Sequence, residues 1–519
     1  MLQISNLKLK LNQDKDNLKK QVVKTLKINE KDILSFEIHK ESIDARKEVI
    51  FVYSVLVEVK NENKYLKYKN VQKYEKFTYK IPKTKSDKRP IVIGFGPTGI
   101  FAAYILAKAN LKPIIFERGS DVDKRSQDVQ KFWQKGILDE ESNVQFGEGG
   151  AGTFSDGKLT TRVKDPRIDF ILQTLVDHNA NPNIKYMAHA HVGTDKLKDI
   201  VKSIRNEIID LGGEVHFNTK VEDFKIENSK IVSVITNNKE YFSDDVVLAI
   251  GHSASDTLKK LNEKNVFMEA KDFAIGVRVE HPQELINKNQ YKNNYNHPKL
   301  KASEYKLTYK PTTGHHVYSF CMCPGGFVVP SSSEKNTIVT NGMSYSNRAN
   351  KRANSAILVQ VKVDDYYKDN VFDGLKYQQN IEKLAFKLSN NSYKANTSNI
   401  KDFIDGRLNE LIFEPSYHLG YQVIDFTKLF DKFIIDSLKE AFINFDNKIE
   451  GFIEKGIMIG PETRSSAVVR IKRADNLESI NTKNLYPAGE GAGYSGGIIS
   501  SFLDGIRVAE KILTKYNIQ

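Results

Sequence analysis

Several kinds of residue and pattern are scarce in this sequence of 519 residues, and each scarcity excludes a class of protein. Its two cysteines, Cys321 and Cys323, are too few for a disulfide framework in a chain of this length. The longest apolar stretch, residues 49–59, is far shorter than the roughly 20 residues that a membrane-spanning helix needs. The start of the chain alternates apolar and polar side chains and lacks the basic and apolar segments of a signal peptide. We therefore expect an ordered globular protein of the cytoplasm, without a membrane partner.

Arginine is scarce too, at only 15 of the 78 basic residues. The formal net charge of +13 and the pI near 9.2 permit a polyanionic partner, because a positive field raises the local concentration of polyanions. The lysines, however, are spread along the chain among many asparagines, and no basic block carries interleaved aromatic residues. A nucleic-acid partner is thus possible but not favoured.

The length and the patterns divide the chain into a small first domain and a larger second one. A single core stops growing at about 250–300 residues, so a chain of this length holds two or three domains. Residues 1–82 predict an α+β domain with strands at 2–11, 33–39 and 49–59 and a helix at 17–26. The polar residues 83–88 predict a linker, after which the pattern changes abruptly.

The strongest motif is a glycine-rich turn between a buried strand, which begins at Ile91, and a helix. Gly94 permits the tight turn, Gly96 lets the backbone approach a pyrophosphate, and Gly99 lets the helix pack near the sheet. A second buried strand follows and ends at Glu117, 18 residues after Gly99, where a carboxylate can accept hydrogen bonds from ribose hydroxyls. An acid at this place disfavours a 2′-phosphate. The unit therefore predicts a dinucleotide site in a parallel α/β sheet.

A second glycine-rich segment near the end of the chain favours FAD over NAD. Residues 484–487 predict a short strand, and a helix runs from about residue 499. Between them, Glu490 is placed to bind ribityl hydroxyls. The helix N-terminus would face flavin N1 and the C2 carbonyl, where its partial positive charge stabilises the reduced form.

On these motifs the chain resembles the uncharacterised FAD-dependent protein family of bacteria, within the glutathione-reductase-like flavoprotein superfamily. The resemblance covers about residues 85–519 and rests on the motifs at 94–99, 146–158, 249–252, 321–326 and 488–498. It implies FAD, with Gly149 to Lys158 beside the pyrophosphate or isoalloxazine, Val221 at the adenine and Gly251 ending a strand beneath the cofactor. Glu490 departs from the more common Gly-Asp pair and looks like the Ala-Gly-Glu version of fumarate-reductase-like flavoproteins, which leaves its ribityl role intact.

The predicted cofactor-binding residues come from the first turn, the acidic strand end, the two later glycine-rich runs and the adenine contact. They are Gly94, Gly96, Pro97, Thr98, Gly99, Glu117, Arg118, Gly149, Gly150, Ala151, Gly152, Lys158, Val221, Gly251, Gly489, Glu490, Ser495, Gly496, Gly497 and Ile498.

The candidate catalytic residues are fewer, and each has a purely structural alternative. Cys321 and Cys323 could relay electrons as a dithiol or simply be buried small residues, since cysteines one residue apart close a disulfide only with strain. His252 is a candidate for proton transfer, as are His315 and His316. Arg464 is the first candidate for a substrate carboxylate, ahead of Arg162 and Arg470. We expect no metal site.

The sequence thus predicts an α/β protein in which a Rossmann-type parallel sheet binds FAD. This domain is expected in two parts, 83–272 and 455–519, around an inserted mixed α+β substrate domain at 273–454. We expect an FAD-dependent oxidoreductase that exchanges hydride or electrons at flavin N5 with a small-molecule substrate. The electron donor, NAD(P)H among the options, stays open because no second strand, GxGxxG turn and helix follow. Two alternatives remain, a flavin-dependent RNA-modifying enzyme and an FAD-fold binding scaffold without turnover.

Overall fold

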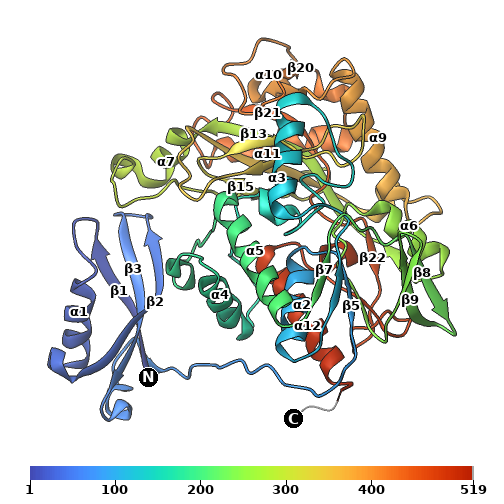
Figure 1. The fold of residues 1–519 in the computed structure, drawn as a ribbon. Helices are drawn as coiled ribbons and strands as arrows, with labels where there is room; N and C mark the ends of the chain where they lie inside the picture. The colour runs from blue at the N-terminus through green and yellow to red at the C-terminus, as the bar shows by residue number, and fades with distance from the viewer. Residues whose placement is uncertain (517–519) are drawn as a thin grey trace.

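The computed structural model describes residues 1–516, and its first part is a small α+β domain (Figure 1). Its sheet has the order β2 (Ile33–Asp44), β3 (Ile50–Val59), β1 (Leu2–Lys10) and β4 (Val71–Lys73). Helix α1 (Asn17–Leu26) buries Leu18, Val22 and Leu26, which lie four residues apart on one helical face. The predicted helix and three strands are present; the three-residue β4 is too short to give a sequence pattern.

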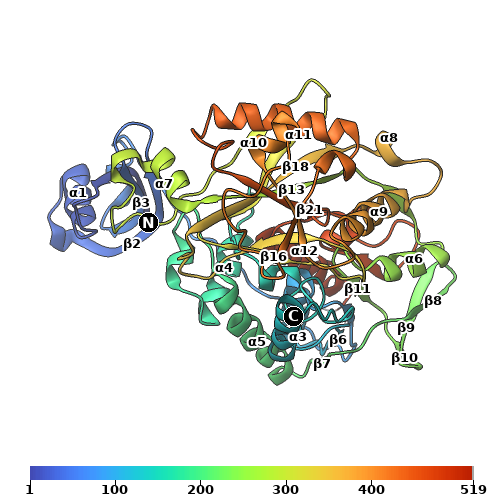
Figure 2. The ribbon, with the colours of Figure 1, turned by 90° about the horizontal axis from the view of Figure 1, so that it is seen from above.

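The small domain lies at one side of the molecule (Figures 1 and 2), and an extended segment joins it to the rest (Figure 1). Its core includes Tyr291, the last residue of α7 (Gln283–Tyr291). Its β2 strand also bonds to the main body, because the Glu41 N–H donates to the Tyr186 carbonyl at 2.7 Å and the Glu41 carbonyl accepts from the Ala188 N–H at 2.8 Å. The domain is therefore docked on the larger unit through backbone hydrogen bonds and apolar contacts.

A five-stranded parallel sheet forms the centre of the second part, as the sequence predicts. Its order is β23 (Leu485–Pro487), β11 (Val246–Leu248), β5 (Ile91–Ile93), β6 (Ile114–Phe116) and β7 (Glu214–His216). One face packs on helices α2 (Pro97–Lys108), α5 (Thr194–Asp210) and α12 (Ile498–Leu513), while Ile91 and Ile93 belong to the core on the other face. Burial on both faces explains the continuous apolar runs of these strands.

A seven-stranded, mostly antiparallel sheet forms the third part, above the parallel sheet in Figure 1. Its order is β14 (Thr308–Tyr309), β15 (Val317–Cys323), β18 (Arg352–Val361), β13 (Phe273–Pro282), β21 (Ile457–Glu462), β19 (Ala395–Asn399) and β20 (Tyr421–Val423). Helices α9 (Asp373–Leu388) and α11 (Lys432–Asp446) pack on one face. The opposite face carries the small cluster Ala274, Ala356, Leu358 and Tyr318.

The boundary predicted at residue 454 is wrong, because β21 lies beyond it and pairs with both β13 and β19. This strand therefore belongs to the inserted sheet and not to the returning part of the cofactor domain. Its residues are all buried, so their apolar pattern is the same in either sheet and could not assign the strand.

The remaining helices and strands lie within or between these three parts. They are α3 (Val122–Lys135), α4 (Arg167–Asp177), α6 (Ser255–Glu263), α8 (Val363–Tyr366), α10 (Ile400–Asp405), β8 (Asp223–Glu227), β9 (Lys230–Thr236), β10 (Lys239–Phe242), β12 (Met268–Ala270), β16 (Phe327–Pro330), β17 (Thr340–Met343) and β22 (Val469–Ile471). Over residues 1–516, the search for a helix with the length and apolarity to cross a bilayer finds none.

The packing of α11 gives a test of the inserted domain. Phe442 is fully buried against the sheet, whereas its neighbour Ile443 is 52% exposed. Phe442→Ala should lower the free energy of unfolding by about 3–5 kcal/mol because it leaves a cavity. Ile443→Ala should change it by less than about 0.5 kcal/mol. Urea unfolding followed by circular dichroism measures both; equal effects would contradict this packing.

Candidate cofactor-binding cleft

The turn between β5 and α2 has the geometry that its glycines predict. Gly94 has φ +93°, and a Cβ atom there would overlap the Ala249 carbonyl. A Cβ at Gly99 would overlap the carbonyl of Gly94, so the helix and the turn approach at backbone distance. A Cβ at Gly96, in contrast, would meet only Gly150, at 3.5 Å. The space beside Gly96 is therefore open to a ligand, which is what a pyrophosphate requires.

Two helix N-termini meet at this turn. Helix α12 packs closely on α2, since a Cβ at Gly505 would lie 3.0 Å from the Ala102 nitrogen. The N-terminal residues of both helices line one cleft. Their unpaired N–H groups and dipoles favour negative charge, such as a pyrophosphate at one helix and a reduced flavin ring at the other.

The cleft brings together most of the predicted cofactor-binding residues, although they come from six separate segments of the chain. Those that line it are Gly94, Gly96, Pro97, Thr98, Glu117, Arg118, Gly150, Ala151, Gly152, Lys158, Val221, Gly251, Gly489, Glu490, Gly496, Gly497 and Ile498. Gly99, Gly149 and Ser495 lie behind this lining. Gly149 donates its N–H to the Phe95 carbonyl at 2.8 Å, and the Ser495 hydroxyl lies 3.3 Å from that of Ser501. These three support the wall of the cleft.

Glu117 connects three loops at the end of β6. Its carboxylate is buried and accepts hydrogen bonds from the N–H groups of Phe95 at 2.7 Å, Gly119 at 2.9 Å and Gly147 at 2.9 Å. A carboxylate has about four lone-pair positions, so one stays free for a ribose hydroxyl. The side chain predicted to bind the ribose thus also holds the loops around it.

Arg125 was missed by the sequence reasoning, yet it holds the loop 143–150 in place. The side chain is fully buried, and its guanidinium donates to the carbonyls of Asn143, Val144, Gly147, Glu148 and Gly150 at 2.6–3.2 Å. Burial lowers the pKa of Arg125 to about 10, so it stays charged at neutral pH. Arg125 lies in a helix of mixed charge, and no sequence pattern marks such an internal donor.

The part of the cleft where adenine is predicted, beside Val221, is also lined by Arg118 and Phe146. The guanidinium lies 4.2 Å from the ring centroid and binds both carboxylate oxygens of Asp256, at 2.9 and 3.0 Å. It also donates to Glu141 at 2.6 Å. Because these bonds fix its plane, Arg118 offers a base a flat surface and not a free charge.

At the other end, Glu490 is half-buried at the turn after β23. Its Oε1 accepts from the Ala467 N–H at 2.8 Å. Burial raises the pKa of Glu490. The second oxygen, Oε2, would lie 2.8 Å from a Cβ at Gly496, so this glycine leaves room for the carboxylate beside the start of α12.

The inserted sheet adds Cys321 and its surroundings to the cleft. Cys321 has φ +43°, uncommon for a residue with a side chain, at a register shift in the pairing of β15 with β18. A hydrogen bond with the Cys323 thiol, together with the buried Arg278, lowers the pKa of Cys321 to about 7, whereas the pKa of Cys323 is raised. Cys321 lines the cleft; Cys323 is buried behind it, and its Sγ donates to the Cys321 carbonyl at 3.2 Å.

His252 and Lys158 also line the cleft. His252 hydrogen-bonds to Ser253 Oγ at 3.0 Å, and burial, with the charges of Arg464 and Lys271 nearby, lowers its pKa to about 4. The imidazole is therefore neutral at pH 7. Lys158 forms an ion pair of 2.7 Å with Glu304, which raises its pKa.

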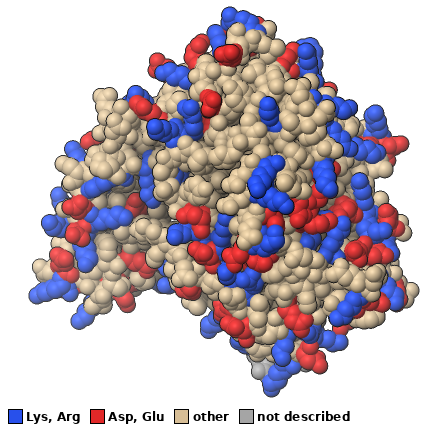
Figure 3. Space-filling model, turned by 45° about the horizontal axis from the view of Figure 1, so that its top comes forward, with Lys and Arg blue, Asp and Glu red and all other residues tan. Residues whose placement is uncertain are grey.

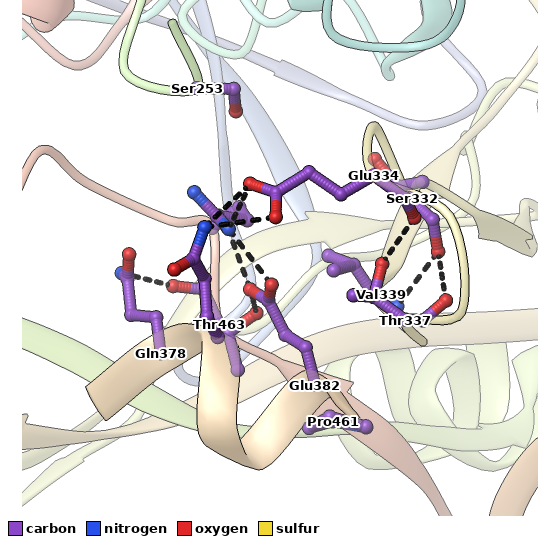
Figure 4. A network of polar contacts seen from close by, with 12 residues as sticks. Ser253, Ser332, Glu334, Thr337, Val339, Gln378, Glu382, Pro461 and Thr463 are labelled. Atoms are coloured by element: carbon purple, nitrogen blue, oxygen red, sulfur yellow. Dashed lines mark hydrogen bonds and ion pairs between the residues drawn. The ribbon is translucent and has the colours of Figure 1, made fainter. Parts of the chain in front are cut away.

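Arg464 is at the edge of the cleft but is held by protein carboxylates. Glu382 binds it through two hydrogen bonds, at 2.6 and 2.8 Å, and Glu334 lies 3.3 Å away. Figure 4 shows the carboxylates of Glu334 and Glu382 pointing toward the same place, with Ser253 above that place in the view. Within residues 1–516 only Nη1 of this guanidinium lacks a partner, and it is buried. The role predicted for Arg464, binding a substrate carboxylate, thus has at most one nitrogen left to perform it.

The four other polar candidates do not line the cleft. His315 is buried, 3.1 Å from the Gln360 carbonyl, whereas His316 and Arg162 are exposed. Arg470 lines a smaller cavity beside the cleft. Their residue types were suitable, but only the tertiary structure decides which of them face the site.

Comparisons with known proteins identify the family of the chain. Residues 272–465 match a family described as "FAD-dependent protein, C-terminal domain-like", and residues 1–58 match a domain of unknown function. An uncharacterized protein of Clostridium beijerinckii is 48% identical over 531 aligned positions, which cover 100% of this chain and 99% of that protein.

Solved structures give a more distant likeness. A geranylgeranyl bacteriochlorophyll reductase-like protein of Thermoplasma acidophilum has a TM-score of 0.36 and 13% identity, covering 83% of this chain and 79% of that one. A glycerol-3-phosphate dehydrogenase of Bacillus halodurans complexed with FAD has a TM-score of 0.35 and 10% identity, with coverages of 84% and 66%.

Gly96→Val tests the placement of the pyrophosphate. The valine methyl groups would fill the space beside α2, so the purified variant should retain less than about a tenth of the flavin of the original protein. The flavin-to-protein absorbance ratio measures this. Gly96→Ala is the matched control for folding, because its Cβ has only an ordinary contact within the protein. Undiminished flavin in the valine variant would show that the cofactor lies elsewhere.

Alkylation by iodoacetamide tests the pair of thiols. The rate at Cys321 should rise with pH through an inflection near 7, because only the thiolate reacts and its pKa is about 7. Cys323→Ala removes the hydrogen bond and should move the inflection upward, whereas Cys323→Ser, which keeps a donor, should move it less. Mass spectrometry of the Cys321 peptide gives the rates. An inflection that is the same in all three proteins would contradict the assigned cause.

Proposed function

Because the chain belongs to the family of uncharacterised FAD-dependent proteins, together with its Clostridium beijerinckii relative, we propose that this flavoprotein is an oxidoreductase acting on a small molecule. One observation carries the proposal. A single cleft joins the dinucleotide-binding turn at Gly96 to ionisable side chains of the inserted domain, among them Cys321. A binding scaffold would need the dinucleotide-binding turn but not the ionisable side chains.

The residues of the cleft fit FAD from end to end. Val221 and Arg118 would contact the adenine, Glu117 the ribose, Gly96 and Gly150 the pyrophosphate, and Glu490 the ribityl chain. Bound FAD supplies reversible acceptance of two electrons, with hydride exchange at N5. The N-terminus of α12 would stabilise the negative charge of the reduced form.

The side chains around the proposed reaction site have distinct roles. His252 is neutral and next to Ser253, so it can donate or accept one hydrogen bond without bringing in a charge. Cys321, which comes from the inserted sheet, has a pKa near neutrality, so it can hold or release a proton at Sγ. Lys158 provides a cation that Glu304 keeps in place.

Anaerobic titration tests the proposal. The purified protein should contain about one FAD per chain, and dithionite should bleach its flavin absorbance. Reoxidation should then be accelerated by a subset of small organic acceptors in a screen. Cys321→Ser should retain FAD but slow that reoxidation by at least about tenfold if its proton is used. A flavin that no reductant bleaches would favour a scaffold without turnover.

The matched control for Cys321→Ser is the same substitution at Cys323, the other cysteine of the pair. Cys323→Ser changes the buried thiol, which does not line the cleft, and should slow reoxidation less. Equal rates in both variants and the original protein would exclude the proposed role of Cys321 while leaving FAD binding untouched.

A further inference from the structure

A second cavity opens beside Glu490, between the inserted sheet and the cofactor domain. It has a volume of about 260 Å³ and shares Phe320, Ser465, Glu490 and Gly496 with the cofactor cleft. Ligand pockets for drug-sized molecules have volumes of roughly 300–1,000 Å³. The cavity is therefore suited to a molecule with about one ring, placed next to the flavin and separate from the adenine end.

One wall of this cavity is apolar and aromatic. Tyr318, Phe320 and Leu358 come from the face of the seven-stranded sheet that turns away from its helices. Tyr494 lines the cavity from the opposite side. Phe320 and Tyr494 are 37% and 36% exposed, so both rings are accessible to a molecule in the cavity. These rings offer a flat surface for a planar or apolar ligand.

Two cations line the same cavity with incomplete neutralisation. Lys271 has no carboxylate within 4 Å in the part of the chain that the structure describes; its Nζ is 3.3 Å from the Ala467 carbonyl and 3.4 Å from that of Asp272. Arg470 lies 3.8 Å from Glu269, and this carboxylate is shared with Lys472 at 3.4 Å. Burial lowers the pKa of Lys271, as expected for a half-buried ammonium group whose hydrogen bonds go to neutral carbonyls.

Glu490 is the carboxylate that lines the cavity, where the other charged side chains are Lys271 and Arg470. One of its oxygens accepts from the Ala467 N–H, and this single carboxylate faces both cations. The cations therefore exceed the anions at the cavity wall, so an incoming anion would gain an ion pair that the protein does not supply.

We propose that this cavity binds the substrate as a small planar carboxylate, with its ring against Phe320 and Tyr494 and its carboxylate on Lys271 and Arg470. The inference rests on the proposed function, since a substrate must lie beside the flavin. To the proposed function it adds the chemical class of the substrate and the place where the substrate binds. It also separates substrate recognition from Arg464, whose guanidinium is already bound by Glu382.

Calorimetry with single-ring probes on the FAD-loaded protein tests the proposal. Benzoate and nicotinate should bind, at least one of them tenfold more tightly than its neutral amide, benzamide or nicotinamide. Arg470→Gln and Lys271→Gln should each weaken the binding of that acid by about 10-fold or more, the size expected for a charge-assisted hydrogen bond. The flavin absorbance spectrum should shift on binding, because the cavity adjoins the cofactor cleft.

Lys472→Gln is the matched control, since Lys472 shares Glu269 with Arg470 but does not line the cavity. Its affinity for the acid should stay within about twofold of the original protein. Acids that bind no better than their amides, or not at all, would overturn the proposal, as would equal losses in the Arg470 and Lys472 variants. If instead the purified protein carried no flavin absorbance, the proposed function itself would fail, which the spectrum shows before any probe is added.

Discussion

The close packing of α2 on α12 is the constraint on which the rest of the structure depends. Gly505 lets α12 approach the backbone of Thr98 and Ala102, and Gly489, in the turn after β23, leaves room for the Thr98 side chain; a Cβ at either glycine would fall within about 3 Å of α2. This contact joins segments about 400 residues apart in the chain. It sets two helix N-termini at one cleft, and their combined partial positive charge makes the place suitable for a molecule with negative charge at two points.

Buried charges then hold the loops around that cleft. Glu117 accepts from three backbone N–H groups, and Arg125 donates to five carbonyls of the loop 143–150. A buried charge is costly unless it is fully hydrogen-bonded, so both side chains stabilise the one loop arrangement that satisfies them. The Rossmann-type fold that the sequence predicts is confirmed, and this polar framework is what turns it into a defined binding site.

The two larger parts of the molecule divide the chemistry between them. The parallel sheet supplies the cofactor contacts, while the inserted sheet supplies Cys321 at a register shift and an apolar face with the small residues Ala274 and Ala356. Lys and Arg are interspersed with Asp and Glu over the surface in Figure 3, so charge there does not gather into one basic field. The chemical groups that distinguish this protein lie inside, between the two sheets.

The sequence by itself determined the βαβ unit, the roles of Gly94 and Gly99 and the acid at Glu117, because these depend on local backbone rules and short spacings. It did not reveal β21 as part of the inserted sheet, the donor Arg125, or the carboxylates that occupy Arg464. Each of these depends on a partner far away in the chain: β13 for β21, the loop 143–150 for Arg125, and Glu382 for Arg464. Which charges are neutralised and which stay available to a ligand is decided only when the chain is folded, since residue type gives the charge but tertiary packing brings its partner.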